Sequence, residues 1–381
     1  MDKMDKEAWL KRLIAFDTTS CNSNLPLIEC VGNWLEHLQI PFTLTYDSTK
    51  TKANLFASLP TSDGSLNGGL ILSGHTDVVP VSGQVWDSNP FCAIKRDNRI
   101  YGRGACDMKG FLAVVLALIP ELQTNSRKHP VHLAFSYDEE VGCLGVPLLI
   151  ADFQQKGIQP LACIVGEPTE MVPVIAHKGI NSFRCRLNGH AAHSCLPPKG
   201  CNAIEYGAKL ICWLRDFAKQ LKEKGFKDDL YDVPYTTLIS TMVSGGIAMN
   251  TIPPSLEFLF EFRNLPEDNP AQISQTIKNY VSEYLIPEMQ KESMDASVEI
   301  EPINCIPAFQ TSENVELIEI LGKRDSIKKV SYATEAGLFQ KAGIPTIVCG
   351  PGRIMEAHKA NEFVSIEQLD ECEKFLRMII R

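Results

Sequence analysis

Five polar residues that could bind a metal ion or move a proton stand just beyond apolar segments of the sequence. Each segment has the length and composition of a buried strand. The five residues are His75, Asp77, Glu139, Glu140 and Glu167. In open α/β sheets, ligands bind at the carboxyl ends of the strands, so these positions predict a shared site. Taken singly, each has a plainer interpretation, because a histidine after a strand is commonly a hydrogen-bonded loop residue and an acidic pair in a turn is commonly solvated.

A further carboxylate, Asp107, lies in the glycine-rich segment 102–110, which has the sequence GRGACDMKG. The glycines of this segment allow tight turns and a close approach of the backbone. Imidazole and several carboxylates, without a C-x-x-C pair of thiolates, form a ligand set that suits Zn²⁺, Co²⁺ or Mn²⁺. The residue types therefore predict metal-dependent chemistry but do not determine which metal is bound.

The elements that must position these residues follow from hydrophobic periodicity. Helical spacing alternates with short apolar strands, which predicts a largely parallel α/β sheet. The expected helices span 6–16, 25–38 and 110–122, and the expected strands span 70–72, 131–137, 162–165 and 345–349.

The pattern changes between residues 179 and 303, where longer amphipathic segments occur in the order β-α-β-β-α-β. This order is typical of a compact two-layer α+β unit. Its expected elements span 183–187, 201–221, 237–243, 256–263, 270–284 and 297–301. We therefore predict an α/β domain of residues 1–178 and 304–381, interrupted by an inserted domain of residues 179–303.

Composition excludes some classes of protein. The chain has 381 residues, of which 44% are hydrophobic, and 46 Asp and Glu against 37 Lys and Arg give a net charge of -9. That balance argues against a nucleic-acid partner. The 13 cysteines are scattered, which favours reduced thiols and a reducing compartment. We find no signal-peptide pattern and no apolar run of membrane-spanning length, so we expect a cytoplasmic protein without a membrane partner.

Five motifs occur along the chain in a recognisable order: SGHTDVVPV, GRGACDMKG, DEEVG, GEPT and GPG followed by EAH. Together they resemble the dinuclear-zinc metallopeptidase and deacylase family that holds acetylornithine deacetylase, succinyl-diaminopimelate desuccinylase, aminoacylase and glutamate carboxypeptidase. The resemblance covers almost the whole chain. It implies a zinc-hydrolase catalytic domain with a mostly parallel sheet, and an inserted domain that serves as lid and dimerisation surface.

The resemblance also implies roles for individual residues. Asp107 is expected to bridge two zinc ions, with the other ligands divided as His75 and Glu167 on one ion and Glu140 and His358 on the other. Glu139 is expected to be the general base and then the general acid. Asp77 is expected to accept the imidazole N–H of His75 and so fix its tautomer. In the family the peptide bond between Asp107 and Met108 is typically cis.

Further residues are expected to contact substrate. His193, in the inserted domain, matches a histidine that reaches across a homodimer to stabilise an oxyanion; the alternative is a surface-loop histidine. Asn250 and Arg263 match substrate-binding positions, and Arg263 suits an α-carboxylate, although an arginine paired within the sheet is the alternative. Gly350 and Gly352 could offer backbone donors to a substrate or form a simple turn.

The implied activity is metal-dependent hydrolysis of the amide bond of a small N-acyl amino acid. Similarity within the family favours N-acetyl-L-ornithine, which would give L-ornithine and acetate in arginine biosynthesis. N-acetylcitrulline, N-succinyl-diaminopimelate and general N-acyl amino acids are the alternatives, and a peptidase is less favoured. Arg353 occupies a position where a small residue is common, and this difference leaves the acyl-amino-acid specificity open. A non-catalytic binding protein is disfavoured, because the full set of ligands and the base is present.

Overall fold

The computed structural model describes residues 4–124, 127–311 and 327–380, and these fold as two compact units. The first unit comprises Met1–Ala176, Phe309–Lys329 and Thr334–Arg381, and the second comprises His177–Ala308 and Val330–Ala333. The sequence had suggested boundaries at 179 and 303. Each unit has a hydrophobic core of its own.

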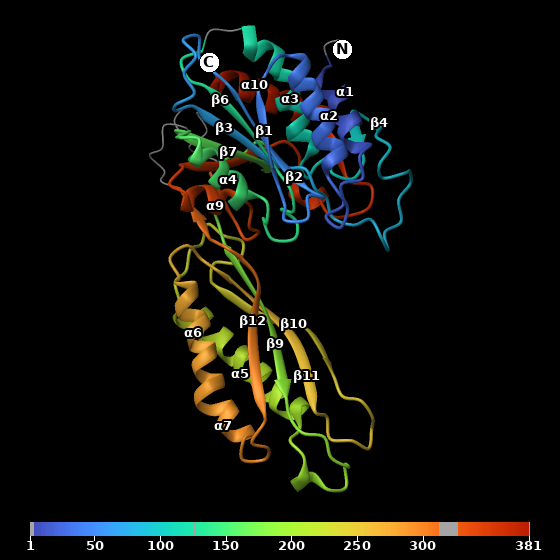
Figure 1. Ribbon diagram of the computed structural model, residues 1–381, viewed down its shortest axis with the longest axis vertical. Coiled ribbons are helices and arrows are strands. Elements are labelled where there is room, and N and C mark those ends of the chain that lie inside the picture. The colour runs from blue at the N-terminus through green and yellow to red at the C-terminus, as the bar shows by residue number, and fades with distance from the viewer. Residues whose placement is uncertain (1–3, 125–126, 312–326, 381) are drawn as a thin grey trace. The chain divides into compact units, whose positions relative to one another are not determined.

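A nine-stranded sheet forms the centre of the first unit (Figure 1). Its main path has the order β1-β2-β6-β3-β7-β15-β8-β13, and β14 pairs with β8. The four central strands β6, β3, β7 and β15 are parallel to one another, which confirms the predicted mostly parallel sheet, while β2 and β8 join them antiparallel on either side. The strand bounds are β1 Phe42–Tyr46, β2 Ala53–Leu59, β3 Leu70–His75, β6 Val131–Ser136, β7 Ala162–Pro168, β8 Val174–His177, β13 Phe309–Gln310, β14 Lys328–Val330 and β15 Thr346–Gly350.

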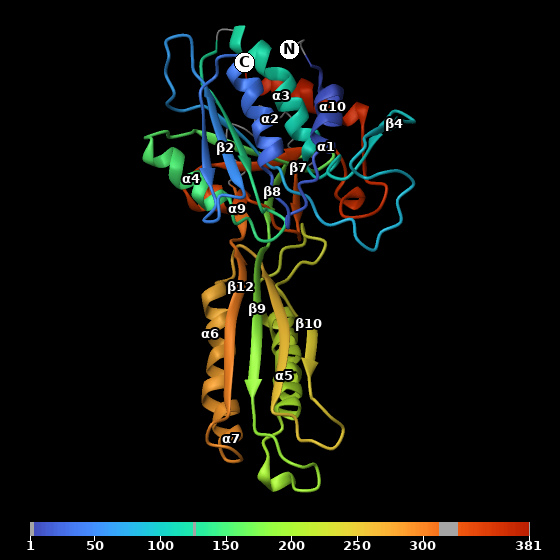
Figure 2. The same ribbon diagram turned by 45° about the vertical axis from the view of Figure 1, so that its right-hand side comes forward.

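Helices cover both faces of this sheet (Figures 1 and 2). One face carries α1 (Lys6–Ile14), α2 (Leu25–His37), α3 (Lys109–Thr124) and α10 (Ile366–Ile379), and the other carries α4 (Val146–Gln155) and α9 (Ala336–Lys341). Helix α3 is apolar on nearly every side because it is packed between the sheet and the helices α1 and α10. A small antiparallel sheet of β4 (Ile94–Arg96), β5 (Arg99–Tyr101) and β16 (Phe363–Ser365) brings the C-terminal segment next to the glycine-rich loop before α3.

The second unit is a four-stranded antiparallel sheet in the order β10-β11-β9-β12 with helices on one face. Its elements follow the predicted β-α-β-β-α-β order. Their bounds are β9 Gly179–Asn188, η1 Pro197–Lys199, α5 Ala203–Lys224, β10 Thr237–Gly245, β11 Ser255–Asn264, α6 Pro270–Tyr280, η2 Val281–Leu285, α7 Ile286–Met289 and β12 Ser297–Ile306. Side chains alternate along β9 and β11, so that Phe183 and Phe260 face the helices while Arg186 and Glu257 pair on the opposite face.

Two further features concern membrane-spanning helices and disulfides. Within the residues that the structure describes, no helix is long and apolar enough to cross a membrane. No disulfide joins the cysteines, all of which lie in the described ranges.

Candidate metal centre and active site

Parallel strands bring the predicted ligands to one edge of the central sheet. His75 ends β3, Glu140 follows β6, and Glu167 lies near the end of β7. Because β6, β3 and β7 are adjacent and parallel, their carboxyl ends lie side by side. Asp107 comes from the loop before α3, where its peptide bond to Met108 is cis as expected. His358 comes from the loop after η4 (Ile354–Glu356).

The two carboxylate oxygens of Asp107 face two different imidazoles. Oδ1 lies 3.0 Å from Nε2 of His75, and Oδ2 lies 3.1 Å from Nε2 of His358. The Asp107 side chain is buried, so neither oxygen has ready access to bulk water. Asp107 therefore lies between two imidazoles that come from distant parts of the chain.

Each half-site contains one further carboxylate. Glu167 Oε1 lies 3.5 Å from Nε2 of His75, and Glu140 Oε2 lies 3.1 Å from Nε2 of His358. By these distances Glu167 lies beside His75 and Glu140 lies beside His358. That each pair holds a separate metal ion, as the family resemblance implies, stays a prediction. Two groups of ligand atoms lie close enough to hold a metal ion: His75, Glu139 and Glu167, and His75, Asp107 and Glu140.

Charge interactions tie the histidines to the bridging carboxylate. Burial by itself would raise the pKa of the Asp107 carboxyl, but hydrogen bonds with His358 and His75 hold that pKa well below its usual value. Hydrogen bonds to Asp107 and Glu140 raise the pKa of His358 to about 10. Burial opposes protonation of His75, yet Asp107 and the other acids around it raise its pKa well above the usual value. The surrounding carboxylates therefore favour positive charge at both imidazoles.

The remaining carboxyl groups repel one another. Burial and the charge of Asp107 raise the pKa of Glu140 to about 6. Burial is also the largest cause of the raised pKa of Glu139 and of Glu167, and neighbouring carboxylates add to it. Divalent cations would relieve this repulsion, and imidazole nitrogens with carboxylate oxygens suit Zn²⁺, Co²⁺ or Mn²⁺. The residues present therefore fit divalent metal ions.

Glu139 lies in the same turn as Glu140 but has different contacts. Its side chain is partly buried and faces His75 and Glu167. Cys143 Sγ approaches its Oε1 at 3.5 Å, and no imidazole hydrogen bond to it is seen among the described residues. A carboxylate beside the ligand cluster, with a raised pKa and few fixed partners, can exchange a proton with a water molecule.

Asp77 acts on the site differently from what we expected. The hydrogen-bond partner of His75 Nδ1 is the backbone carbonyl of Asp77, at 2.9 Å, while the Asp77 carboxylate is 3.6 Å away. A carbonyl can only accept, so Nδ1 carries the proton and Nε2 is left for a metal ion. The Asp77 carboxylate instead accepts hydrogen bonds from the backbone N–H groups of Glu139 and Glu140, at 3.0 and 3.2 Å. It therefore fixes the turn that contains Glu139 and Glu140.

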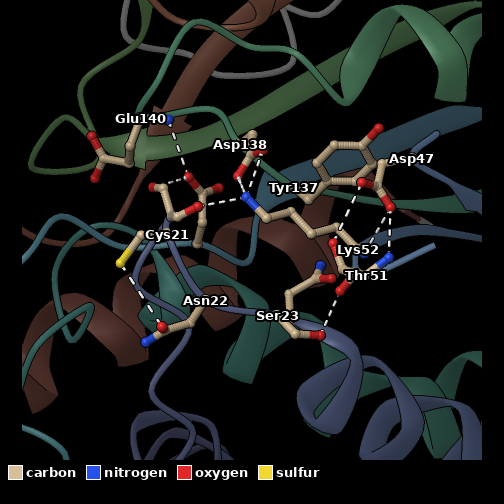
Figure 3. A network of polar contacts seen from close by, with 12 residues as sticks. Cys21, Asn22, Ser23, Asp47, Thr51, Lys52, Tyr137, Asp138 and Glu140 are labelled. Carbon is tan, nitrogen blue, oxygen red and sulfur yellow. Dashed lines mark hydrogen bonds and ion pairs between the residues drawn. The ribbon is translucent and has the colours of Figure 1, made fainter. Parts of the chain in front are cut away.

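A buried ion pair supports the same turn (Figure 3). Lys52 Nζ lies 2.5 and 2.7 Å from the two carboxylate oxygens of Asp138, and it also donates to the carbonyl of Ser20. Asp138 adopts a positive φ of 54°, which turns the chain sharply just before Glu139. Lys52 thus anchors β2 to the residue that precedes the acidic pair.

Glu362 positions the bridging ligand, and the sequence analysis missed it. Its Oε1 accepts the backbone N–H groups of Cys106 and Asp107 at 2.9 and 3.1 Å, and its Oε2 pairs with Arg103 at 2.6 Å. Both members of this ion pair are almost completely buried. Glu362 lies four residues after His358, so one short segment supplies a ligand and also holds the loop of the bridge. The sequence feature that could have indicated Glu362 is its position directly before the strand-like run 363–365.

Glu335, the N-cap residue directly before α9, is a second buried carboxylate that the sequence analysis did not single out. It accepts hydrogen bonds from the hydroxyls of Ser73 on β3 and Ser136 on β6. These serines lie near the carboxyl ends of the two strands, and Ser136 pairs in register with His75. Burial raises the pKa of Glu335 despite both hydrogen bonds. Its contacts join the strands that carry His75 and Glu140.

The two glycines expected to face a substrate are used inside the protein. The Gly350 N–H donates to the Thr169 hydroxyl at 3.2 Å, and the Gly352 N–H donates to Gln368 Oε1 at 3.2 Å. A Cβ on Gly350 would lie 2.0 Å from the Gly166 carbonyl oxygen. These positions require glycine because the backbone is closely packed, so the structure gives no support to the expected donor role.

The other predicted residues belong to the second unit. His193 is exposed, and its Nδ1 accepts the backbone N–H of Cys195 at 3.2 Å. Asn250 is exposed, and its carbonyl accepts the backbone N–H of Ser194 at 3.0 Å, which joins its loop to that of His193. Arg263 Nε pairs with Glu261 Oε1 at 2.9 Å on the same strand.

Comparisons with known proteins identify the family of the chain. The sequence model of peptidase family M20/M25/M40 matches residues 71–381. The acetylornithine deacetylase of Pasteurella multocida is 32% identical over 94% of this chain and 91% of its own length. That of Erwinia tasmaniensis is 33% identical over 96% of this chain and 93% of its own length.

Solved structures share the fold at low sequence identity. An M20 family metallo-carboxypeptidase from Sulfolobus solfataricus has a TM-score of 0.75 at 18% identity and covers 100% of this chain and 99% of its own. A dinuclear metal-binding peptidase of the M20 family from Bacillus subtilis has a TM-score of 0.63 at 15% identity and covers 98% of both chains.

Proposed function

The chain belongs to peptidase family M20/M25/M40, and we propose that it removes the acyl group of an N-acyl amino acid. Hydrolysis of an amide bond with divalent metal ions is the chemistry of its relatives in this family. The preferred substrate in this proposal is N-acetyl-L-ornithine, which would place the reaction in arginine biosynthesis. The observation that supports it most strongly is the Asp107 carboxylate, whose two oxygens face His75 and His358 at 3.0 and 3.1 Å.

Two Zn²⁺ ions are the proposed cofactors, with Co²⁺ or Mn²⁺ as possible substitutes. His75, Glu167 and Asp107 would hold one ion, and His358, Glu140 and Asp107 would hold the other. When bound, such ions polarise the amide carbonyl and lower the pKa of a water molecule towards about 7. Glu362 and the Asp77 carbonyl keep Asp107 and His75 in the orientation that ligation requires.

Glu139 is the proposed proton carrier. Its carboxylate takes a proton from the attacking water as the new C–O bond forms. It then delivers that proton to the amine nitrogen as the C–N bond breaks, so the products are a carboxylate and a free amino acid. The Asp77 carboxylate holds the Glu139 backbone in place for both transfers. Proton transfer by a positioned side chain contributes about 10²–10⁴-fold to the rate.

His193 is the proposed oxyanion donor. Because its Nδ1 accepts the Cys195 N–H, the neutral ring carries its proton on Nε2. That N–H is exposed and available to a developing negative charge. Following the family, we place it in the active site of the partner chain of a homodimer, together with Asn250. Arg263 is the candidate partner of the substrate carboxylate, although it would have to share or break its ion pair with Glu261.

The edge strand β10 is the proposed dimer contact. Its side chains are mostly exposed, including Met242 at 67% and Val243 at 64%, and β10 ends the sheet order with an open row of backbone groups. An exposed apolar edge strand favours pairing with another chain. Pairing of two β10 strands would continue the sheet and bury these residues.

Initial rates on a panel of acylated amino acids test the proposal. The panel contains N-acetylornithine, N-acetylcitrulline, N-succinyl-diaminopimelate and several neutral N-acetyl amino acids, with the enzyme loaded with Zn²⁺ and the Glu139→Gln variant as blank. We expect N-acetylornithine to give the highest kcat/KM. A higher value for another member would refute the named substrate, and no hydrolysis of any member would refute deacylation.

A further inference from the structure

A cavity of about 850 Å³ opens in the first unit at the end of the sheet opposite the metal centre. Leu59, at the end of β2, lines it and pairs in register with Val131, the first residue of β6. The ligand cluster lies beyond Ser136, the last residue of β6. Six residues of strand separate the two ends, which is about 17–20 Å. The cavity is therefore a different place from the metal centre.

The charge of the cavity lining is opposite to that of the protein. The chain has a net charge of -9, yet the described lining residues include no aspartate or glutamate and two cations, Arg127 and Lys156. The positive charge of Lys156 is already compensated, because its Nζ pairs with Asp152 at 2.5 Å. Arg127 has no such carboxylate partner among the described residues.

Arg127 is buried with its hydrogen-bonding capacity largely unused. The residue is 8% exposed, and its Nη2 donates to the carbonyl of Pro60 at 2.7 Å. Its Nε and Nη1 are buried and have no hydrogen-bond partner in the structure. A buried charge is costly unless it is paired, and a guanidinium offers donors in a fixed fork that matches a carboxylate. Arg127 therefore places a largely buried charge, without a carboxylate partner among the described residues, in the lining of the cavity.

The other walls of the cavity are suited to an apolar body. Phe42, Phe56, Leu59 and Ile158 supply aromatic and aliphatic surface. Hydroxyl groups such as that of Ser58 stand among them, and this one already contacts His132 Nδ1 at 2.8 Å. The lining combines these apolar side chains with polar ones, and a mostly apolar cavity with placed polar groups is the usual form of a small-molecule site.

We propose that this cavity binds a small organic monoanion, a carboxylate on an aliphatic chain, with the carboxylate on Arg127 and the chain against Phe42, Phe56 and Leu59. The site does not depend on the proposed deacylase activity, because it shares no residue with the metal centre. A single unpaired cation matches a single negative charge, and the apolar side chains of the lining match an aliphatic chain.

Two probes of equal shape test the proposal: 6-bromohexanoate and the neutral 6-bromohexan-1-ol. Crystals of the metal-loaded protein are soaked in each, and the anomalous signal of bromine locates the chain. Calorimetry in solution then compares their affinities. We expect bromine in the cavity with the acid, and affinity for the alcohol weaker by about tenfold or more, because a hydrogen bond to a charged group is lost.

Variants assign the effect to one side chain. Arg127→Met should weaken binding of the acid at the cavity about tenfold or more, whereas Lys156→Met, which removes a cation already paired with Asp152, should change it little. The comparison of the two probes needs no variant, so it stands even if Arg127→Met fails to fold. Equal affinities for acid and alcohol, or bromine found only at the metal centre or nowhere, would overturn the proposal, as would binding seen at crystal concentration only.

Discussion

At the scale of single residues, Glu139 and Glu140 are neighbours in sequence with different contacts. Glu140 lies 3.1 Å from His358 Nε2, whereas Glu139 has no imidazole hydrogen bond in the described structure. We predict that Glu139→Gln retains its metal ions and fold but lowers kcat by about 10²–10⁴-fold, because an amide cannot accept the proton of water. Metal analysis and steady-state rates measure both properties.

Glu140→Gln is the matched comparison for this prediction, because it makes the same chemical change one residue away. It should lower the affinity for one metal ion, with a loss of activity that added metal partly restores. A Glu139→Gln enzyme with near-normal kcat and full metal content would show that the base lies elsewhere.

The pKa of His358 leads to a prediction about metal binding. Since Asp107 and Glu140 raise that pKa to about 10 in the metal-free protein, the imidazole is protonated near neutral pH and must lose its proton to bind a cation. We predict that binding releases at least one proton per chain. The apparent affinity for the metal ion should therefore rise with pH. At pH values below that pKa, it should rise about tenfold per pH unit for each proton released. Calorimetry in buffers of different ionisation enthalpy measures the release, and affinity independent of pH would contradict the assignment.

At the scale of elements, the segment after η4 both supplies a ligand and holds the bridging loop through Glu362. We predict that Glu362→Gln lowers metal affinity about 10–100-fold, as expected when a group that orients a ligand is changed. It should also destabilise the fold, because Arg103 would keep its buried charge without a partner. The exposed Glu367, in the first turn of α10, provides the control Glu367→Gln. Equal metal affinities in the two variants would remove Glu362 from this role.

The edge strand β10 gives a second prediction at this scale. Replacing Met242 and Val243 together by lysine should convert a dimer to a monomer, because two exposed apolar side chains become charged at the proposed contact. Sedimentation velocity measures the change, and metal content should stay constant. Leu230→Lys, at a loop position 60% exposed in the same unit, is the control. A double variant that remains a dimer would place the contact elsewhere.

The elements that sequence could predict are those whose pattern is local. The apolar run 110–122 predicted helix α3, which spans Lys109–Thr124, and the alternation around Phe183 predicted strand β9. The candidate ligands could be identified because each follows an apolar strand or matches a family motif, and the fold brings them together.

The contacts that sequence could not predict depend on residues far apart in the chain. Glu362 contacts Asp107 across 255 positions, and Glu335 contacts Ser73 across 262. A buried carboxylate and a surface carboxylate have the same letter in the sequence, and only the fold distinguishes them. The same reason explains Asp77, whose backbone carbonyl and not its carboxylate accepts the His75 N–H, and Gly350, whose N–H is occupied by Thr169.

At the scale of the whole molecule, the proposed homodimer predicts complementation between inactive chains. Glu139→Ala lacks the base and His193→Ala lacks the oxyanion donor. In a mixed dimer, the His193→Ala chain retains its own Glu139 and would receive an intact His193 from its partner. Random reassortment makes about half the dimers mixed, each with one of two sites restored, so activity should return to roughly a quarter of wild type.

This experiment has its own control, because mass spectrometry shows whether mixed dimers form. Activity that stays at the level of the two parents, in a preparation where mixed dimers are present, would mean that His193 acts within its own chain or has no catalytic role. The metal centre would be unaffected by that result.

The central claim is that one carboxylate, Asp107, joins two metal sites. The most direct measurement is calorimetric titration of the metal-free protein with Zn²⁺, with the bound metal counted per chain. We predict two ions per wild-type chain, and loss of both high-affinity sites in Asp107→Ala, because each half-site takes one oxygen from that residue. A wild-type chain that is active with one ion, or an Asp107→Ala chain that still binds two ions with unchanged affinity, would contradict the account.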